Sequence, residues 1–379
     1  MNIWVIFGSR TAEHDVSITS AYGIMKGLRK AWIYEVFPIY ITQSWKWIYN
    51  PNFEDINNFK DLDALEGLNM TIDFSKSGKL CIHQKWKWLL AKDTHLEIDV
   101  VIPVLHGLNW EDGTVQWVLD LLQVPYASPS VIGSAVGMNK TIMKNVFAYH
   151  NLPMSKYLVF ENDDSDLDKI ESELRYPLFV KPANLGSSIW VSKVDNRDEL
   201  INGIELAYHY DREIMVEEWV TNLMELNCSA MEKDWEVISS LVEQPVTSGA
   251  FLNFEEKYTS SDWATMQWVK DKVKIPAPIT DDLTIKIQNM AKKAYSVLKC
   301  NGWAPRIDFL YDTQADQLYI NEINTIPGAL QVYLWEKSWL SVPNFLWALI
   351  DTAIVKNKQK KLNIDFKSNI IDYTIGFQK

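Results

Sequence analysis

Two carboxylates and an amide lie close together in one segment, RIDFLYDTQADQLYINEINTIPG, which runs from Arg306 to Gly328. Its pattern predicts two strands joined by a turn over residues 312–317. Glu322 and Asn324 share a face of the second strand, and Asp308 on the first strand can join them. Such oxygen ligands suit Mg²⁺, with phosphate oxygens and water as its other ligands. The alternative is an ordinary acidic surface hairpin, but charge among apolar neighbours is costly, which favours the metal site.

A lone lysine in an apolar segment is the second candidate. Lys181 lies in PLFVKP (Pro177–Pro182), a predicted strand, and the tight loop NLGSS (Asn184–Ser188) follows it. A phosphate group would neutralise a buried ammonium here, and the small loop residues would let backbone N–H groups approach phosphate oxygens. A lysine whose ammonium group reaches solvent before an ordinary turn explains the pattern equally well.

Three polar loops could also contribute to a site. GSRTAEHDVS (Gly8–Ser17) and HGLNWEDG (His106–Gly113) each follow an apolar run, and an ordinary strand-to-helix connection is as good an interpretation as a site. FEEKYTSSD (Phe254–Asp262) has Lys257 beside Tyr258, but its pattern alone favours a solvated loop.

Alternating strands and helices would position the first two of these loops. Apolar runs predict strands over Asn2–Phe7, Tyr34–Ile41 and Val100–Leu105, and apolar residues at helical spacing predict a helix over Val16–Leu28. This alternation indicates a parallel sheet. Such sheets bind ligands in the loops at the carboxyl ends of their strands.

Two further units follow along the chain. A predicted helix carries Lys140 and Lys144, a later strand covers Ile214–Glu217, and a helix over Asp281–Leu298 precedes the acidic hairpin. The length of 379 residues suits two or three domains. We expect an N-terminal α/β domain over residues 1–127, a central domain over 128–216 and a C-terminal α+β domain over 217–379.

Composition excludes several classes of protein. With 47% hydrophobic residues the chain is not disordered, and its net charge of −12 argues against broad binding to nucleic acid. No apolar run approaches the roughly 18 residues of a membrane span, and the first residues form a strand pattern rather than a signal peptide. Three scattered cysteines, at positions 81, 228 and 300, fit a reducing cytoplasm better than a disulfide framework or a zinc site.

Taken together, these segments resemble the D-alanine–D-alanine ligases of the ATP-grasp superfamily. The resemblance runs in order through FGSRTAEHDVS, HGLNWEDGT, FVKPANLGSS, FEEKY, RIDF and NEINTIPG, nearly the whole length of the chain. It implies an ATP-grasp fold with an N-terminal parallel-sheet domain. It also implies an enzyme that makes D-alanyl-D-alanine for peptidoglycan precursors through an acyl-phosphate formed with ATP.

The resemblance further implies which residues bind ATP and metal ions. Lys140, Lys181 and Lys257 match lysines that contact the ATP phosphates. Arg306 matches the arginine that steadies the transferred phosphate and the tetrahedral intermediate. The residues that match adenine and ribose contacts are Glu217, Val220 and Glu225, and those that match the ligands of two Mg²⁺ ions, with Mn²⁺ possible, are Asp308, Glu322 and Asn324.

The substrate residues follow from the same resemblance. Glu13 matches the carboxylate that holds the ammonium group of the first D-alanine. Ser187 and Tyr258 match its hydrogen-bonded partners across a closed lid that would exclude water. Gly328 lies beside the second D-alanine. We therefore expect D-alanine as substrate, no nucleic-acid or membrane partner, a cytoplasmic location and a homodimer.

Two alternatives remain open. A related ligase would use D-lactate or D-serine as second substrate. Tyr258 argues against lactate, whereas the short run ALQVYLWE after NTIPG leaves D-serine open. The other alternative is a non-catalytic nucleotide-binding remnant, although such a remnant has no reason to keep the five residues Lys181, Arg306, Asp308, Glu322 and Asn324.

Tryptophan stands where the family has glycine. The chain has 17 Trp and only 15 Gly, well below the usual glycine share of roughly 7%. We hypothesise that these tryptophans correspond to UGA codons that the source reads as glycine. The alternative is a tryptophan-rich relative with a remodelled site. The clearest motif positions are Trp4, Trp110, Trp117, Trp190 and Trp339, and Trp45 and Trp235 occupy expected turns.

Overall fold

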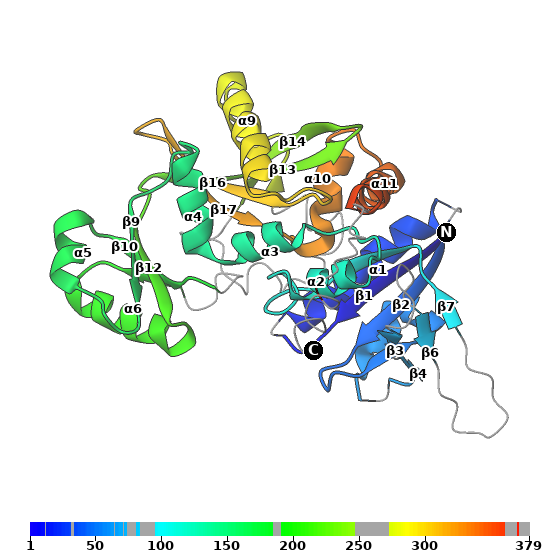
Figure 1. Ribbon diagram of the computed structural model, residues 1–379. Coiled ribbons are helices and arrows are strands. Elements are labelled where there is room, and N and C mark those ends of the chain that lie inside the picture. Colours follow the sequence, from blue (N-terminus) through cyan, green and yellow to red (C-terminus); the bar gives the residue numbers. More distant parts are fainter. Residues whose placement is uncertain are drawn as a thin grey trace.

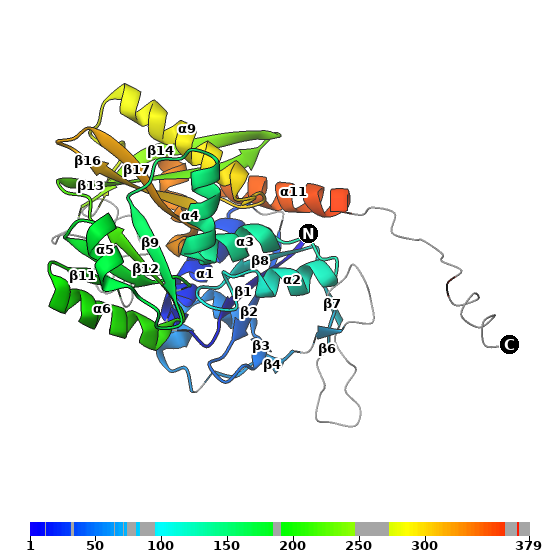
Figure 2. The ribbon, with the colours of Figure 1, turned by 60° about the vertical axis from the view of Figure 1, so that its left-hand side comes forward.

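The structure, a computed structural model, describes residues 1–360 and 370 except for 12, 32–33, 64, 71, 74–80, 84–94, 185–190 and 247–272. Within these residues the strands form four sheets. Figures 1 and 2 show three lobes, one around each of the larger sheets, with the small fourth sheet at the edge of the N-terminal lobe.

The N-terminal lobe is built on a mixed five-stranded sheet: three neighbouring strands are parallel, as predicted, and two short antiparallel strands extend one edge. Strand β1 (Asn2–Gly8) pairs in parallel with β2 (Glu35–Ile41) and with β8 (Val100–Val104), as the apolar runs predict. Alternate side chains of β1 pack toward helix α1 (His14–Arg29) and helix α2 (Thr114–Leu121), so both faces of the strand are covered. The other elements of this lobe are β3 (Trp47–Tyr49), η1 (Pro51–Glu54), η2 (Ile56–Lys60), β4 (Leu68–Asn69), β5 (Ile72–Asp73), β6 (Cys81–His83) and β7 (His95–Glu97).

The register of this sheet places two candidate loops side by side. Phe7 near the end of β1 pairs with Val104 at the end of β8. The loops that follow these two strands therefore leave the sheet from the same edge, as expected for parallel strands.

An antiparallel sheet forms the central lobe, drawn in green in Figure 1. Helices α5 (Leu167–Glu173) and α6 (Arg197–Tyr210) cover one face of it, where the apolar residues of the strands are buried. The opposite face carries Lys181 and Glu217, because side chains alternate along each strand. The strands lie in the order β11 (Ser192–Val194), β10 (Leu178–Pro182), β12 (Glu213–Glu218) and β9 (Tyr157–Glu161).

The helix expected before this lobe is two helices, α3 (Val131–Met138) and α4 (Lys140–Tyr149). They are separated at Asn139, whose backbone is extended and whose side chain caps α4 by accepting a backbone hydrogen bond at 2.7 Å. Its amide group also donates to Asn184 Oδ1 at 2.8 Å and to Glu213 Oε2 at 2.9 Å. The cap therefore ties the start of α4 to the central sheet.

The C-terminal lobe is built on a second antiparallel sheet, in the order β15-β14-β13-β16-β17. Helix α9 (Asp281–Val297) packs on one face, close to its predicted bounds. Helices α10 (Val332–Lys337) and α11 (Val342–Lys360) join a core that continues into the N-terminal lobe. The remaining elements are β13 (Leu223–Lys233), β14 (Glu236–Pro245), β15 (Val273–Lys274), β16 (Arg306–Asp312), β17 (Gln317–Asn324) and η3 (Gly328–Gln331).

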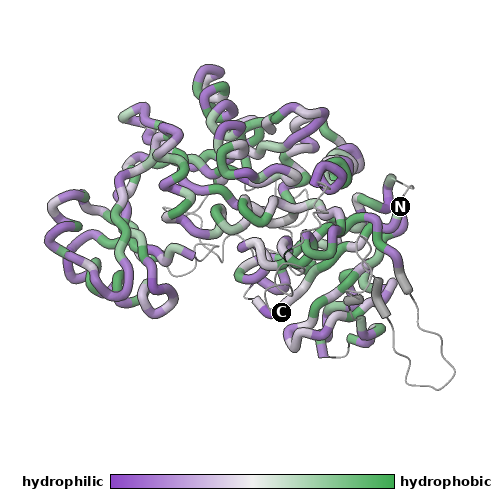
Figure 3. Tube along the Cα trace, in the orientation of Figure 1, coloured by the Kyte–Doolittle hydropathy of each residue, from purple (hydrophilic) through white to green (hydrophobic). Residues whose placement is uncertain are grey.

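Hydrophobic residues concentrate on the buried strands, and hydrophilic residues are frequent on the outer helices and turns (Figure 3). Among the helices of the described part, none combines the length and hydropathy needed to cross a lipid bilayer.

Three tryptophans, at positions 45, 235 and 339, occupy turns that favour glycine; we call them the tryptophan turns. Asp234 and Trp235 form the two-residue loop between β13 and β14, with φ of 50° and 70°. Positive φ at both positions is typical of a type I′ turn, whose preferred sequence is Asp-Gly. Trp45, with φ of 64°, ends the loop between β2 and β3 at the place where a left-handed residue is usual.

The third of these turns ends helix α10. The N–H of Leu340 donates to the carbonyl of Trp335 at 2.9 Å, and the N–H of Trp339 donates to that of Glu336 at 3.3 Å. These two bonds define a Schellman motif, in which Trp339, with φ of 66°, takes the position that glycine usually fills. The side chain of Trp339 is 84% exposed, so packing does not explain its presence there.

The buried tryptophans fall into two groups. Trp335 donates its indole N–H to Ser229 Oγ at 3.0 Å and stacks on Phe345. In contrast, the indole N–H groups of Trp4, Trp110 and Trp303 have no hydrogen-bond partner among the described residues. Buried polar groups are normally paired, so of the buried tryptophans that the structure describes only Trp335 has the environment expected of a native one.

Candidate functional site

The acidic hairpin brings its polar residues onto one face, as the alternation predicts. Asp308 on β16 pairs with Glu322 on β17. Two residues along, and so on the same face, Arg306 pairs with Asn324. The apolar residues between them point into the core of the C-terminal lobe. Two carboxylates, an amide and a guanidinium group therefore share this surface, which we call the acidic face.

Both carboxylates of the acidic face have cationic partners. Nε of Arg306 lies 2.5 Å from Oδ1 of Asp308, and Nη2 lies 2.8 Å from Oδ2, which makes a bidentate ion pair. Nζ of Lys140 lies 3.9 Å from Oε2 of Glu322. Although burial opposes the charge of Arg306, the carboxylate of Asp308 raises its pKa, so the guanidinium group stays protonated.

A second group of charges, the charged cluster of Lys140, Lys144, Lys181 and Glu217, lies where α4 meets the central sheet. Lys140 and Lys144 are one helical turn apart and share a face of α4. Glu217 on β12 pairs with Phe179 on β10, so Lys181 is its diagonal neighbour on the same face. Nζ of Lys144 lies 2.6 Å from Oε2 of Glu217, and Nζ of Lys181 forms an ion pair with Oε1.

All four side chains of the charged cluster are buried. Burial lowers the pKa of Lys140 and of Lys144. Burial alone would raise the pKa of Glu217, but the ammonium groups of Lys144 and Lys181 lower it to about 2. Two ammonium groups, those of Lys144 and Lys181, thus pair with the one carboxylate of Glu217. Buried positive charge of this kind is stabilised by an anion. The cluster suits phosphate.

The other predicted nucleotide residues lie farther along the chain from β12. Val220 is buried just beyond the strand, and Glu225 is half-buried on β13, opposite Leu310 of β16. The carboxylate of Glu217 is engaged by two lysines, so a contact from Glu217 to adenine would have to use its main chain.

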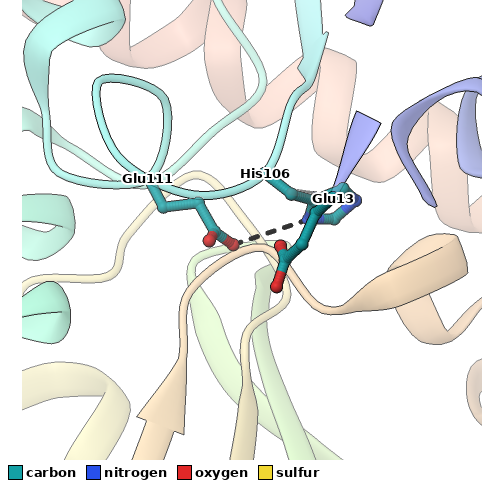
Figure 4. Close-up of side chains that lie close together, drawn as sticks. All are labelled: Glu13, His106 and Glu111. Atoms are coloured by element: carbon teal, nitrogen blue, oxygen red, sulfur yellow. Dashed lines mark ion pairs between the residues drawn. The ribbon is translucent and has the colours of Figure 1, made fainter. Parts of the chain in front are cut away.

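In the N-terminal lobe, Glu13, His106 and Glu111 converge from two loops (Figure 4). Glu13 directly precedes α1, and His106 follows β8, so the neighbouring ends of β1 and β8 bring them together. One carboxylate or imidazole atom from each residue lies within 4.8 Å of the others. Oε2 of Glu111 accepts the N–H of Gly107 at 2.8 Å, and its Oε1 lies 3.6 Å from Nδ1 of His106.

This cluster carries negative charge in a buried place. Burial alone would lower the pKa of His106, but the hydrogen bond and charge of Glu111, with a smaller contribution from Glu13, raise it. Two carboxylates beside one histidine leave a site that can accept a cation such as a substrate ammonium group. The residue pattern alone left both loops undecided, because strand-end loops are common without a function, and the family resemblance marked only Glu13.

Gly328 opens η3, which follows β17 after residues 325–327, and is half-buried. Close by, a buried network surrounds Glu243, whose Oε1 accepts from Asn227 and Gln331 at 3.1 Å and from Tyr333 at 3.3 Å. Burial raises the pKa of Glu243. This network was not predicted from the sequence, because its members come from separate elements and share no motif.

Three predicted site residues, Ser187, Lys257 and Tyr258, lie outside the described residues, as does Trp190. Their roles stay predictions. The residues that are described fit a divalent metal ion at the acidic face: two carboxylates and an amide oxygen are hard ligands, and each carboxylate already attracts a cationic side chain.

Comparisons with known proteins agree with this geometry. Residues 2–129 match the family described as D-ala D-ala ligase N-terminus, and residues 146–354 match D-ala D-ala ligase C-terminus. The D-alanine–D-alanine ligase of Natranaerobius thermophilus is 35% identical over 375 residues, covering 96% of this chain and 97% of that protein.

Solved structures share the fold. The VanG D-Ala:D-Ser ligase from Enterococcus faecalis is similar with a TM-score of 0.77 and 29% identity, covering 93% of this chain and 99% of that one. The D-alanine–D-alanine ligase from Coxiella burnetii gives a TM-score of 0.78 at 24% identity, covering 100% and 99% of the two chains.

Proposed function

We propose residue-level roles for a chain that belongs to the D-alanine–D-alanine ligase family. The enzyme has the ATP-grasp fold and joins two D-alanine molecules to D-alanyl-D-alanine for peptidoglycan synthesis, with ATP and divalent metal ions. One observation carries the proposal: buried ammonium groups with excess positive charge lie beside an acidic face, and Lys140 connects the two.

Lys140 and Lys181 bind the phosphates of ATP, and Lys257 adds a third contact. Their charge offsets the negative charge of the triphosphate, which a buried site would otherwise exclude. Val220 and Glu225 contact adenine and ribose, together with the main chain of Glu217.

Asp308, Glu322 and Asn324 hold two Mg²⁺ ions, which Mn²⁺ can replace. When bound, the ions neutralise charge on the phosphate oxygens. Arg306 is already held in place by Asp308 through two hydrogen bonds. It presents a fixed positive charge to the phosphoryl group as this passes to the carboxylate of the first D-alanine.

Glu13 holds the ammonium group of the first D-alanine, and His106 and Glu111 complete the pocket around it. The acyl-phosphate formed on the carboxylate of this D-alanine is then attacked by the amine of the second D-alanine, beside Gly328. Water would hydrolyse the acyl-phosphate, so the loops with Ser187 and Tyr258 close over the site.

The domain bounds, the cellular location and the oligomeric state complete the proposal. We divide the chain into domains at residues 1–127, 128–216 and 217–379. We place the enzyme in the cytoplasm, where ATP is available and where Cys228 and Cys300, which are free and buried, stay reduced. We also expect a homodimer.

The test is phosphate release from ATP with Mg²⁺ and D-alanine, with the dipeptide identified by mass spectrometry. It is run on the chain as printed and on Trp190→Gly. Dipeptide formation by either protein supports the proposal, and formation only after Trp190→Gly also supports the glycine hypothesis. Phosphate release with D-serine but not D-alanine as second substrate would overturn the assigned substrate.

A matched pair tests the pocket for the first D-alanine. Glu13→Gln removes the charge that faces the ammonium group, so we expect the KM for D-alanine to rise about tenfold or more while ATP affinity is kept. Glu205→Gln, on the exposed side of α6, is the control. An unchanged KM for Glu13→Gln would remove this residue from the pocket.

A further inference from the structure

Lys144 has no part in the roles above, yet it is the most deeply buried member of the charged cluster. Its side chain is 1% exposed, against 8% for Lys181. A buried ammonium group costs free energy unless charge and hydrogen bonds compensate it. Because nothing in the proposed chemistry uses Lys144 directly, its contacts must show what it does.

These contacts are with one carboxylate and its surroundings. Nζ lies 2.6 Å from Oε2 of Glu217 and 4.9 Å from the centre of the Tyr157 ring, where the aromatic face favours a cation. Ser155 Oγ donates to the same Oε2 at 3.4 Å. Lys144 is therefore held on one oxygen of Glu217, and Lys181 is paired with the other.

Sharing the carboxylate changes the charge that Lys181 can offer. A carboxylate paired with Lys181 alone would cancel its ammonium charge and compete with any phosphate for it. Two ammonium groups against one carboxylate leave one positive charge. Since Lys144 is enclosed, that remaining charge is available at Lys181, the more exposed of the two lysines.

We propose that Lys144 is a positioning residue that acts through Glu217: it occupies one carboxylate oxygen, so that Lys181 keeps its charge for the phosphates of ATP. The inference rests on the proposed function, in which Lys181 contacts those phosphates. Lys144 itself does not touch ATP.

The test measures Mg-ATP binding by titration calorimetry without D-alanine, so that it does not depend on turnover. In Lys144→Met, Glu217 pairs with Lys181 alone, and we expect the Kd for ATP to rise about tenfold. In the double variant Lys144→Met with Glu217→Gln, the competing carboxylate is also gone. There we expect the Kd to return to within about threefold of the starting value.

The double variant separates this role from a structural one. If Lys144 only filled space or anchored α4, removing Glu217 as well would not recover ATP affinity. A double variant that binds ATP no better than Lys144→Met therefore overturns the inference, as does an unchanged Kd in Lys144→Met. Lys286→Met, on the exposed side of α9, controls for the loss of a positive charge elsewhere.

Two further measurements keep the outcome clear. Thermal unfolding shows whether each variant is folded, and Lys144→Gln replaces Lys144→Met if the latter is not. Lys181→Met tests the premise in the same assay. If it leaves the Kd unchanged, the phosphate site itself is wrong and the inference falls with it. If it weakens binding and Lys144→Met does not, only the inference fails.

Discussion

The charged cluster and the tryptophan turns both carry a cost in folding free energy, but from different sources: buried charge in the cluster and backbone conformation in the turns. In the cluster the side chains are buried and charged, and Glu217 has an ionic partner on each of its oxygens. In the turns the side chains of Trp235 and Trp339 are mostly exposed, and the backbone adopts a conformation that disfavours any side chain. The cluster keeps the residue types that chemistry requires. In the turns the fold requires a left-handed backbone, and the tryptophan side chains are not the type that this backbone favours.

The strongest test of this contrast is at the acidic face. If the acidic face serves catalysis, Glu322→Ala should abolish ATP turnover, because it removes a proposed metal ligand and the partner of Lys140. Phosphate release in the presence of D-alanine measures the effect. Gln317→Ala, at the exposed start of the same strand, should be active. Full activity of Glu322→Ala would remove the metal assignment.

The dependence of stability on pH in acid tests whether Glu217 is ionised in the folded protein. Its pKa is lowered from 4.5 to about 2, so it contributes stability above its ordinary pKa that is lost as the pH falls through this range. In Glu217→Gln that contribution is absent. The difference in unfolding free energy between the two proteins should therefore shrink from pH 5 toward pH 2, measured by urea unfolding. A constant difference would contradict an ionised carboxylate.

The smallest effects are expected in the turns, and their sign is informative. Trp235→Gly and Trp339→Gly relieve a left-handed residue without uncovering buried surface, so each should raise the free energy of unfolding by about 1 kcal/mol. Trp117 is 57% exposed but lies within helix α2. There Trp117→Gly should lower the free energy of unfolding by about 0.5 kcal/mol, because glycine disfavours helices. If all three substitutions changed the free energy of unfolding in the same direction, the turn backbone would not explain the effect at Trp235 and Trp339.

The codons of the gene test the hypothesis directly. UGA at Trp4, Trp110, Trp117, Trp190 and Trp339 would support decoding as glycine, and UGG at these positions would rule it out. The mass of peptides from the natural protein is an independent check.

The sequence predicted those parts of the site that lie on one continuous segment. Asp308, Glu322 and Asn324 could be placed on one face, because a hairpin with a short turn leaves little freedom in its register. The parallel strands and helix of the N-terminal lobe also follow from apolar patterning, with bounds that differ by one or two residues.

Contacts between separate elements could not be predicted in the same way. Lys144 lies on a helix where a lysine is ordinarily solvated, and only the packing of α4 on the central sheet buries it against Glu217. The break at Asn139 was missed because the segments on both sides have helical spacing, and a side-chain cap rather than periodicity decides it. His106 and Glu111 likewise could be assigned to a site only after the structure placed Glu13 beside them.

The indole rings of Trp45 and Trp110 stack 5.7 Å apart with an angle of 28° between their planes. Two chromophores this close couple their electronic transitions, which splits an absorption band into a pair of circular-dichroism bands of opposite sign. This optical signal would arise within the N-terminal lobe and vanish when that lobe unfolds, so it would follow one part of the molecule separately from the rest. A chain with glycine at either position would lack it.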